Sequence, residues 1–518
     1  METNKPLGKG SFYLTTPIYY VNDAPHIGHS YTTVAADALA RYERLKGRDV
    51  FFLTGTDEHG QKIYRAAQAC NETPETLVNQ VVERYKCLWK NLFVSNDDFI
   101  RTTEPRHTRR VQKVFQRLCD KGDIYLGEYE GWYCTPCESF WTTGQLIEGK
   151  CPECSRTAER LKEVNYFFKL SKYRDKILQH IDRNPEFIQP ESRRNELRNR
   201  LLAGVDDVSV SRQSLPWGIP VPMDPEHTIY VWIDALLNYI TALGYDDEME
   251  RFNRYWPADV HLIGKEILWF HGAIWPAVLM ALDLPLPKKV FAHGWWTIEG
   301  QKISKSLGNA IDPLKITEQY GVDAYRYFIL REVPFGMDGN FSYTMLVHRI
   351  NSDLGNDLGN LLMRSLTMIE KFSDGKIPSP QGTREEDINL TEGAARLETK
   401  LDEEMKALQF SQALETVWEF VAQTNKYIEE SKPWVLAKKD KQALSTTLYN
   451  IAEALRLISI HISPFMPQTS REIFSQLGIP EEDRFQRSER TWGKLKPLTK
   501  TKKGKALFPR IEMSAQLA

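Results

Sequence analysis

The feature that most constrains this chain is a strand pattern near the N-terminus that runs directly into a helix pattern. Ser11–Tyr20 is dense in aromatic and β-branched residues, which is typical of a buried strand. From Ile27 the apolar residues recur at a helical period that stops at Gly47, and Asn22 or Asp23 is an expected cap. A helix that begins directly after a buried strand points unpaired backbone N–H groups at the turn, which favours an anion site there.

Two histidines lie in the first turn of this expected helix. His26 and His29 are three residues apart, so both imidazoles should project from one face. Gly28 between them lets a flat group approach the backbone closely. The arrangement suits a nucleotide, although on local pattern alone an ordinary pair of surface or core histidines is the favoured interpretation.

A second strand is predicted at Asp49–Thr54, followed by the polar run Gly55–Gly60. Strand, helix and strand in this order indicate a doubly wound α/β domain with a parallel sheet, in which ligands bind at the carboxyl ends of the strands. Asp57 is therefore a candidate for holding a cationic group such as an amine, and equally a candidate for a turn-forming aspartate. The pattern from residue 72 to residue 121 is helical, and the 518-residue length predicts two to four domains.

Two Cys-x-x-Cys pairs follow, between residues 121 and 164. Cys134 and Cys137 form the first pair, and Cys151 and Cys154 form the second. Four thiolates can complete a closed tetrahedron, so we expect a structural site for one Zn²⁺ per chain. A pair of redox motifs is the less favoured alternative. The other cysteines are expected to be buried thiols in helices: Cys70, Cys87 and Cys119.

The chain then returns to an α/β pattern. Three further strands are expected at Thr228–Trp232, Val260–Ile263 and Val290–His293. Between the last two, Ile267, His271 and Trp275 recur at a helical spacing. Such an aromatic stripe is more often core than pocket, but a single histidine among aromatic residues is also a plausible polar group in a binding pocket.

A lysine-rich loop follows the strand that ends in Ala292-His293-Gly294. In Lys302-Ile303-Ser304-Lys305-Ser306, two lysines flank small hydroxyl residues. Such a loop could close on a polyphosphate and follow charge that develops during a reaction. By itself it would mean little, but it shares one α/β chain with the histidine turn.

Together, His26-Ile-Gly-His29 and Lys302-Ile-Ser-Lys305-Ser306 resemble the two signature motifs of class I aminoacyl-tRNA synthetases. The methionyl-tRNA synthetase family, in its branch with a single zinc knuckle, is resembled more specifically by Gly55–Gly60, Tyr230–Ala235, Gly264–Ile267 and the cysteine pairs. The resemblance covers essentially the whole chain. Ile303 stands where that family usually has methionine.

The resemblance implies a Rossmann-type catalytic domain with an inserted zinc-knuckle domain, followed by an α-helical bundle that binds the anticodon. Long amphipathic runs at 351–372, 395–430 and 441–461 independently indicate such a bundle. The expected boundaries are 1–120 and 226–292 for the catalytic halves, 121–225 for the insertion, 293–350 for a stem-contact region, 351–497 for the bundle and 498–518 for a tail that packs back on the body.

The implied activity is the ATP-dependent attachment of methionine to tRNA(Met). The carboxylate of methionine attacks the α-phosphate of ATP, which enters with Mg²⁺, and gives methionyl-adenylate and pyrophosphate. The terminal adenosine of tRNA then takes the methionyl group and AMP is released. No protein nucleophile is required, so catalysis should depend on positioning and on stabilising developing charge.

The family's functional positions transfer to this sequence in three groups, beside the four cysteines. The ATP-binding group is His26, Gly28, His29, His293, Gly294, Lys302 and Lys305, of which His26, His29, Lys302 and Lys305 are the expected catalytic residues. The methionine-binding group is Ile18, Tyr20, Asp57, Trp232, Leu236, Tyr239, Ile267, His271 and Trp275, with Asp57 on the amine and the aromatic rings around the thioether. The anticodon-binding group is Asn360, Arg364 and Trp434, although Trp434 taken alone would be interpreted as a packing residue.

Charge and hydropathy restrict the partners. A formal net charge of −2 excludes a uniformly basic nucleic-acid binder, and no apolar run is long enough to span a membrane. The N-terminus shows no signal or transit pattern, so a cytoplasmic protein is expected. The lysine-rich stretch 494–505 could contact tRNA phosphates or could be a solvated linker. The sequence given shows no appended oligonucleotide-binding domain, which in this family often carries dimerisation, so a monomer is expected.

Two other functions remain open from the sequence. One is a class I synthetase for another amino acid, although the short insertion argues against the valine, isoleucine and leucine enzymes with their large editing domains. The other is a catalytically silent tRNA-binding paralogue, against which intact His26, His29 and Lys305 argue. Methionine-dependent exchange of pyrophosphate into ATP separates all three functions.

Overall fold

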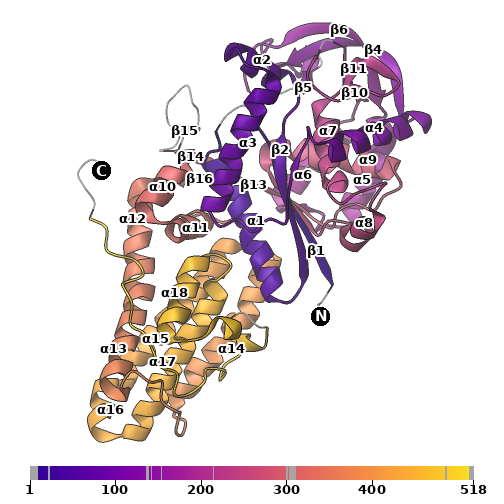
Figure 1. The fold of residues 1–518 in the computed structure, drawn as a ribbon. Coiled ribbons are helices and arrows are strands. Elements are labelled where there is room, and N and C mark those ends of the chain that lie inside the picture. Colours follow the sequence, from indigo (N-terminus) through magenta and orange to yellow (C-terminus); the bar gives the residue numbers. More distant parts are fainter. Residues whose placement is uncertain are drawn as a thin grey trace.

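The computed structural model has an α/β body with an attached antiparallel lobe and, below it, an elongated helical domain (Figure 1). The structure describes residues 10–21, 24–135, 139–141, 143–152, 154–213, 215–298, 301–302, 311–484 and 487–512.

The body is organised around a parallel sheet of six strands in the order β3-β2-β1-β12-β13-β7. The strands are β1 (Ser11–Tyr20), β2 (Asp49–Asp57), β3 (Asp98–Arg101), β7 (Ile188–Gln189), β12 (Val260–Gly264) and β13 (Val290–His293). The strand order reverses between β1 and β12, which makes the carboxyl ends of these two strands the switch point where open α/β sheets bind ligands. The predicted doubly wound fold is confirmed.

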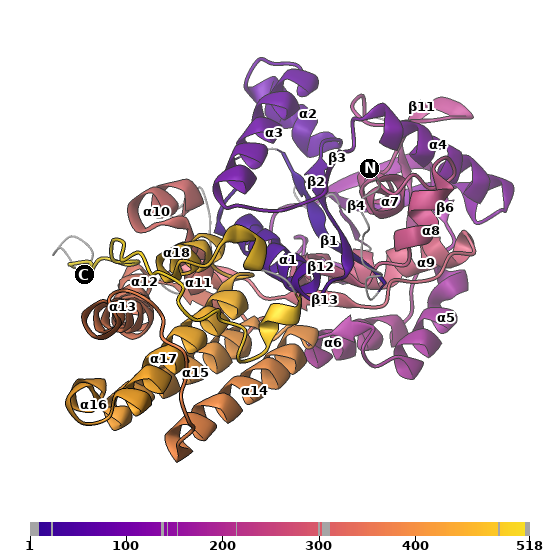
Figure 2. The ribbon, with the colours of Figure 1, turned by 60° about the horizontal axis from the view of Figure 1, so that its bottom comes forward.

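Helices cover both faces of this sheet. They include α1 (Ile27–Leu45), α2 (Gln61–Ala69), α3 (Pro74–Asn91), α4 (Pro105–Asp120), α7 (Val231–Thr241), α8 (Met249–Tyr255) and α9 (Trp275–Ala281). Figure 2 shows α1 and α3 on one side of the strands and α7, α8 and α9 on the other. The predicted helical stretch 72–121 is wrong in its middle, because β3 separates α3 from α4 and is too short to show a period of its own.

Residues between α4 and α7 form the antiparallel lobe. Its elements are β4 (Ile124–Cys134), β5 (Ser139–Trp141), β6 (Glu159–Phe168), α5 (Leu170–Arg183), α6 (Glu191–Leu202), β8 (Val208–Ser209), β9 (Ser211–Arg212), β10 (Pro220–Val221) and β11 (Asp224–Ile229). One strand of this segment leaves the lobe, because β7 pairs in parallel with β13 through Val290 and Ile188. The segment expected as an insertion therefore completes one edge of the central sheet.

Two expectations in the second half of the body are wrong in detail. The strand predicted at Thr228–Trp232 ends at Ile229, and α7 begins at Val231, so Trp232 is helical. The helix expected across the aromatic stripe is composite: a 3₁₀ turn at Lys265–Ile267, a π-helical turn at Phe270–Ile274 and then α9.

A small sheet and short helices lead to the helical domain. They are β14 (Trp296–Ile298), β15 (Gln301–Lys302), α10 (Pro313–Tyr320), α11 (Val322–Arg331), β16 (Gly339–Phe341) and α12 (Tyr343–Arg349). The helical domain contains a π-helical segment at Ile350–Gly359, then α13 (Asn360–Ser373), α14 (Glu385–Lys406), α15 (Phe410–Ser431), α16 (Pro433–Lys439), α17 (Lys441–Ile462) and α18 (Pro467–Leu477). None of the described helices combines the length and apolar character that crossing a bilayer requires.

The bundle predicted from the amphipathic runs is confirmed, with one break. The run 395–430 is divided between α14 and α15, and Leu408 in the connection has a φ of +59°, which a continuous helix does not allow. The tail contacts the bundle, since Asn351 donates from its amide to the carbonyl of Ile511 at 2.9 Å.

A buried arginine joins the two large domains. Arg326 on α11 has no solvent exposure and lies 2.7 Å from the carboxylate of Asp37 on α1. It also donates to the carbonyl of Phe465, before α18, at 2.8 Å and to that of Leu92, after α3, at 2.9 Å. The helical domain is therefore fixed to the helix that follows β1.

Candidate active site

Two histidines cap the helix at the switch point. The N-cap of α1 is His26, whose Nδ1 accepts from the backbone N–H of Gly28 at 3.1 Å. The Nδ1 of His29 accepts from the backbone N–H of His26 at 3.1 Å, and the two rings stack with centroids 3.9 Å apart. The predicted projection from one face is confirmed. The N-cap is His26, and the expected caps Asn22 and Asp23 lie outside the described residues.

These bonds determine where the imidazoles carry their protons. Because each Nδ1 accepts from the backbone, a neutral ring carries its hydrogen on Nε2. Burial lowers the pKa of His26, and burial together with the neighbouring His26 and Lys62 lowers the pKa of His29 well below its usual range. A cavity of about 560 Å³ opens beside His26, between α1, α3 and α10. Two neutral Nε2–H donors at a helix N-terminus suit anionic oxygens such as those of a phosphate.

The local structure explains why position 28 is a glycine. A Cβ at this position would lie 3.0 Å from Cε1 of His26. The flat group that approaches the backbone here is therefore the imidazole of His26, which folds back over its own helix. A side chain in place of Gly28 would push this ring away and disturb the cap.

An irregularity in β1 lies just before two expected pocket residues. The pairing of β1 with β2 shifts register between Thr15 and Ile18, and Pro17, which has no N–H for the ladder, lies within the shift. Beyond it, Ile18 and Tyr20 pack against the core that contains α7. The ring of Tyr20 meets that of Trp232 edge-on, with centroids 6.4 Å apart.

One face of α7 supplies three of the predicted methionine-binding residues. Trp232, Leu236 and Tyr239 are spaced by four and three residues, and all are buried. Phe270, which the sequence interpretation did not include, stacks on Trp232 with centroids 3.6 Å apart and an interplanar angle of 7°. Its only signal was membership of an aromatic run, and such a run does not distinguish pocket from core.

Tyr239 and His271 are the polar part of this aromatic group. The Nδ1–H of His271 donates to the carbonyl of Ile267 at 3.0 Å, so Nε2 accepts from the hydroxyl of Tyr239 at 2.7 Å. Burial lowers the pKa of His271 to about 4, despite the opposing effect of that carbonyl. The ring of Trp275 lies 5.8 Å from that of Tyr239. His271 lies on the π-helical turn, a rare conformation that is frequent at functional sites.

Asp57 is the last residue of β2 and is buried at the same edge of the sheet. The loop that follows it is anchored, because Arg101 donates to both carboxylate oxygens of Glu58 at 2.7 and 2.9 Å. Thr56 donates to Glu58 at 2.6 Å, and the indole of Trp217 donates to the carbonyl of Glu58 at 2.5 Å. A carboxylate at the end of a strand, next to a loop held in this way, suits a cationic amine.

His293 and Gly294 follow β13 on the other side of the switch point. The Nδ1–H of His293 donates to the carbonyl of Gly294 at 2.8 Å, and Nε2 lies 2.6 Å from the hydroxyl of Thr32 on α1. Both ring nitrogens are thus engaged within the protein, so His293 braces β13 against α1. A Cβ on Gly294 would lie 2.3 Å from the carbonyl of Met337, which only glycine avoids.

The sequence interpretation gave no role to a cluster of four side chains beside Gly294, although two of them lie in the Gly264–Ile267 motif. Lys265 donates to both carboxylate oxygens of Asp338 at 2.8 and 2.7 Å and lies 4.1 Å from the ring centroid of Trp295. Trp295 donates from its indole to Glu266 at 2.6 Å. Charged residues at a strand end carry no periodic signal, and the contact with Asp338 exists only in the folded chain.

The predicted catalytic lysines are only partly within the described residues. Lys302 lies on β15, where its backbone pairs with Thr297 of β14. Lys305 lies outside the described residues, as does the rest of 303–310.

Three of the four predicted zinc ligands converge. The sulfur atoms of Cys134, Cys151 and Cys154 lie within 4.8 Å of one another. Those of Cys134 and Cys154 are 3.5 Å apart, well beyond a disulfide bond of about 2.05 Å. Cys137 lies outside the described residues. Three soft sulfur donors, two of them buried, fit Zn²⁺.

The other cysteines do not behave as predicted. Cys70 and Cys87 are exposed, and Cys119 is half-buried. The prediction of buried thiols is wrong, because Cys70 is the C-cap of α2 and Cys87 lies on the solvent side of α3, away from its buried face.

The expected anticodon residues lie on two helices of the bundle. Asn360 and Arg364 are on α13, and Arg364 forms an ion pair with Glu429 of α15. Trp434 is on α16, at the end of the domain farthest from the central sheet (Figure 1), and 43% of its surface is exposed. An indole this accessible does not have the burial of a packing residue.

Two protein families match the sequence of this chain. The family described as tRNA synthetases class I (M) matches residues 12–164 and 155–366. The family described as Anticodon-binding domain of tRNA ligase matches residues 388–506. The matches cover the α/β body and the helical domain in turn.

Individual relatives agree with these matches. A Methionine–tRNA ligase of Caldanaerobacter subterraneus subsp. tengcongensis is 59% identical over 98% of this chain and 80% of the relative. That of Thermotoga maritima is 50% identical over 97% of this chain and 80% of the relative. The solved structure of Mycobacterium tuberculosis methionyl-tRNA synthetase in complex with methionyl-adenylate has a TM-score of 0.94 and 42% identity, and covers 97% of this chain and 100% of that one.

Proposed function

This chain belongs to the methionyl-tRNA synthetase family of class I, and we propose which of its residues carry each part of the reaction. It is a methionine–tRNA ligase that charges tRNA with methionine in an ATP-dependent reaction, through methionyl-adenylate. First, a carboxylate oxygen of methionine attacks the α-phosphorus of ATP and pyrophosphate leaves. Then a hydroxyl of the terminal ribose of tRNA(Met) attacks the methionyl carbonyl carbon and loses its proton, and AMP leaves.

The phosphates of ATP bind at the N-terminus of α1. His26 and His29 donate from Nε2–H to phosphate oxygens, and the unpaired backbone N–H groups of the first turn add a favourable field. Because burial keeps these histidines neutral, they donate hydrogen bonds from Nε2–H without carrying a positive charge. Lys302 and Lys305 supply the positive charge that compensates the pentacoordinate α-phosphate as it forms.

His293 and Gly294 set the opposite wall of the ATP site. Since both nitrogens of His293 are engaged within the protein, we assign it to holding β13 against α1 rather than to direct contact with phosphate. Gly294 keeps the backbone close to Met337 and leaves room for the adenosine. ATP enters with Mg²⁺, which shields the departing pyrophosphate.

Methionine lies between the ends of β1 and β2 and the ring face of α7. Asp57 holds the α-amine, and this fixes the carboxylate towards the histidine turn. The thioether side chain occupies the aromatic group, where sulfur–ring contacts favour a soft, polarisable atom. The proposed lining is Ile18, Tyr20, Trp232, Leu236, Tyr239, Ile267, His271 and Trp275, to which we add Phe270.

Zinc and the anticodon are assigned to the parts outside the catalytic site. Cys134, Cys151 and Cys154, with Cys137, would hold one structural Zn²⁺, which would tie the β4–β5 hairpin to the following loop. Asn360, Arg364 and Trp434 would read the CAU anticodon, with the exposed indole as a stacking surface.

The proposal rests mainly on two features that lie together at the carboxyl ends of the strands. The neutral His26–His29 pair offers donors for phosphate at the N-terminus of α1, and Tyr239 and His271 form a buried aromatic cluster with one polar contact. The test is exchange of labelled pyrophosphate into ATP by the purified protein. Exchange should require methionine, and isoleucine or leucine should not replace it. Exchange that depends on another amino acid would contradict the substrate, and absence of any exchange would contradict catalysis.

A further inference from the structure

A buried aspartate with no part in the reaction joins three segments around the methionine pocket. Asp234, in the first turn of α7, has no solvent exposure. Its Oδ2 lies 2.7 Å from Nδ1 of His59, in the loop after β2. Its Oδ1 lies 2.6 Å from Nε2 of His107, in the first turn of α4. Three elements therefore meet at one carboxyl group.

The charges at this junction determine the direction of its hydrogen bonds. Burial alone would raise the pKa of Asp234, but His59 and His107 outweigh burial and hold the pKa below its usual range. The side chain is therefore a carboxylate, and both imidazoles donate to it. Removing either donor would leave a buried negative charge poorly compensated, which costs free energy, so the junction has a strongly preferred geometry.

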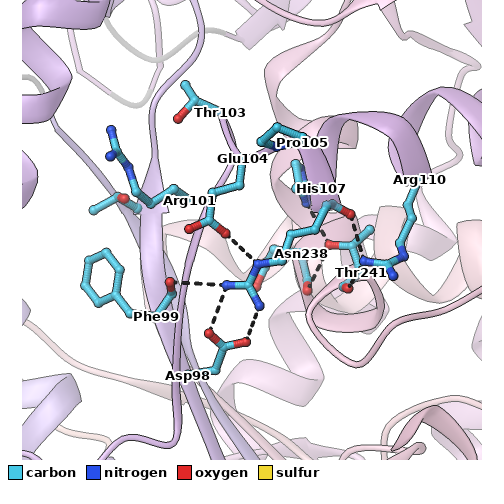
Figure 3. Close-up of polar contacts among 12 residues, drawn as sticks. Asp98, Phe99, Arg101, Thr103, Glu104, Pro105, His107, Arg110, Asn238 and Thr241 are labelled. Carbon is cyan, nitrogen blue, oxygen red and sulfur yellow. Dashed lines mark hydrogen bonds and ion pairs between the residues drawn. The ribbon is translucent and has the colours of Figure 1, made fainter. Parts of the chain in front are cut away.

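His107 holds α7 at a second point. Its Nδ1 lies 2.7 Å from the hydroxyl of Thr241, further along α7. Arg110, in the next turn of α4, donates to the carbonyl of Thr241 at 3.2 Å. Figure 3 shows His107 and Arg110 of α4 facing Asn238 and Thr241 of α7. The two helices are thus joined by polar contacts at both ends of α7.

The junction lies behind both walls of the methionine pocket. Asp234 lies between Trp232 and Leu236 in sequence, and a spacing of two residues places it on a different side of α7 from these side chains. His59 is two residues from Asp57, in the loop that the Glu58 contacts anchor. A movement of Asp234 therefore displaces the ring face of α7 relative to Asp57.

We propose that Asp234 is a positioning residue for methionine: through His59 and His107 it fixes the separation between the Asp57 carboxylate and the ring face of α7. This inference rests on the proposed function, which assigns the amine to Asp57 and the thioether to α7. Among the described residues, the hydrogen bonds of Asp234 reach neither α1 nor β13, so the ATP site is independent of it.

The test separates the Michaelis constants of the two substrates in pyrophosphate exchange. Asp234→Asn keeps the shape of the side chain but places an NH₂ donor against an imidazole N–H. We expect the KM for methionine to rise by about tenfold or more, while the KM for ATP stays within about twofold. His59→Ala, at the edge of the junction, should raise the methionine KM in the same way but less, and it tests the proposal if Asp234→Asn does not fold. An equal rise in both KM values, or an unchanged methionine KM in the folded variants, would overturn the proposal.

Asp387 provides a matched control. It is a buried aspartate of α14 whose Oδ1 accepts from Arg384, Tyr427 and Asn450 at 3.0, 2.5 and 3.1 Å. Asp387→Asn should lower the Tm and leave both KM values unchanged. If it raised the methionine KM as Asp234→Asn does, general destabilisation would explain the effect and the proposal would fail. Failure of the proposed function is a distinct result, because the wild-type protein would then show no methionine-dependent exchange.

Discussion

The hydroxyl of Tyr239 lies 2.7 Å from Nε2 of His271 and donates a hydrogen bond to that nitrogen. The other ring nitrogen sets the direction of this hydrogen bond, because Nδ1–H donates to the carbonyl of Ile267 and leaves Nε2 as the acceptor. A proton on Nε2 would reverse this hydrogen bond, with the Tyr239 hydroxyl as acceptor, and would place a positive charge in a buried aromatic cluster. Burial disfavours that charge and lowers the pKa of His271 to about 4, so the ring is neutral near pH 7.

The first prediction is that His271 makes the protein less stable in mild acid. Its folded pKa of about 4 lies below the ordinary 6.5, so in this window the unfolded chain binds a proton that the folded chain does not. Stability is therefore complete above about pH 6.5 and falls as the pH is lowered towards 4. Between about pH 7.5 and pH 5 the loss through this residue should be about 2 kcal/mol. Urea denaturation of the wild type and of His271→Gln at both pH values measures it, and equal pH dependence would contradict the prediction.

The second prediction concerns Lys305. If it acts only as charge develops on the α-phosphate, Lys305→Ala should lower kcat for adenylate formation and change the methionine KM little. The loss should correspond to about 2–4 kcal/mol, as for other preorganised donors. Single-turnover formation of adenylate is the measurement. A variant with normal kcat and weakened methionine binding would show that the lysine does not act in the transition state.

Asp57 should give the opposite kinetic pattern. Its carboxylate meets the amine in the ground state as well as in the transition state, so Asp57→Ala should mainly raise the methionine KM. Asp57→Asn is the control, because it keeps the shape and removes only the charge. The assignment would be refuted if both variants bound methionine normally in equilibrium dialysis.

The fourth prediction concerns the metal. Because the thiols of Cys134, Cys151 and Cys154 already converge, the purified protein should contain one zinc ion per chain. Cys151→Ser should lose the metal and impair aminoacylation, while far-UV circular dichroism shows that the α/β body still folds. Elemental analysis that finds no metal, together with four native thiols open to a thiol reagent, would exclude the site.

The last prediction separates the two large domains. Trp434 lies on α16, far from the catalytic sheet, and 43% of it is exposed. If its indole stacks on an anticodon base, Trp434→Ala should weaken tRNA binding by about 1–3 kcal/mol, and Trp434→Phe should restore most of it. Pyrophosphate exchange needs no tRNA and should be unchanged.

Two results would contradict this anticodon assignment. A packing tryptophan would lower the Tm and both activities together. Normal charging by Trp434→Ala would also refute the assignment, although the catalytic proposal would stand. Arg364→Ala should weaken tRNA binding in the same selective way and relax discrimination against an altered anticodon.

Local periodicity predicted the parts of the fold that obey it. β1, α1, β2 and α17 appear where the apolar pattern places them, because each is a single regular element. The apolar pattern gave no prediction, or a wrong one, where the backbone conformation changes within a few residues. β3 has four residues, and the change from 3₁₀ to π to α before Trp275 has no sequence period of its own.

Contacts between distant segments were the other limit. The sequence singled out His26 and His29, but their mutual capping depends on backbone angles. Asp234 lies in the Tyr230–Ala235 motif and Glu266 in the Gly264–Ile267 motif, but neither these motifs nor the aromatic run around Phe270 show which distant residues the side chains contact. The candidate site was therefore predicted as a set of residues, and the structure adds the direction of each hydrogen bond.

The pairing of β1 with β12 also sets the earliest point in synthesis at which the centre of the sheet can form. Leu14 lies opposite Val260, so the two strands that border the switch point are separated by most of the first half of the chain. At elongation rates of about 5–20 residues per second, on the order of 10–50 s pass between the synthesis of β1 and that of β12. Until β12 is made, the edge of β1 that it will cover presents unpaired backbone groups, which are open to pairing with wrong partners.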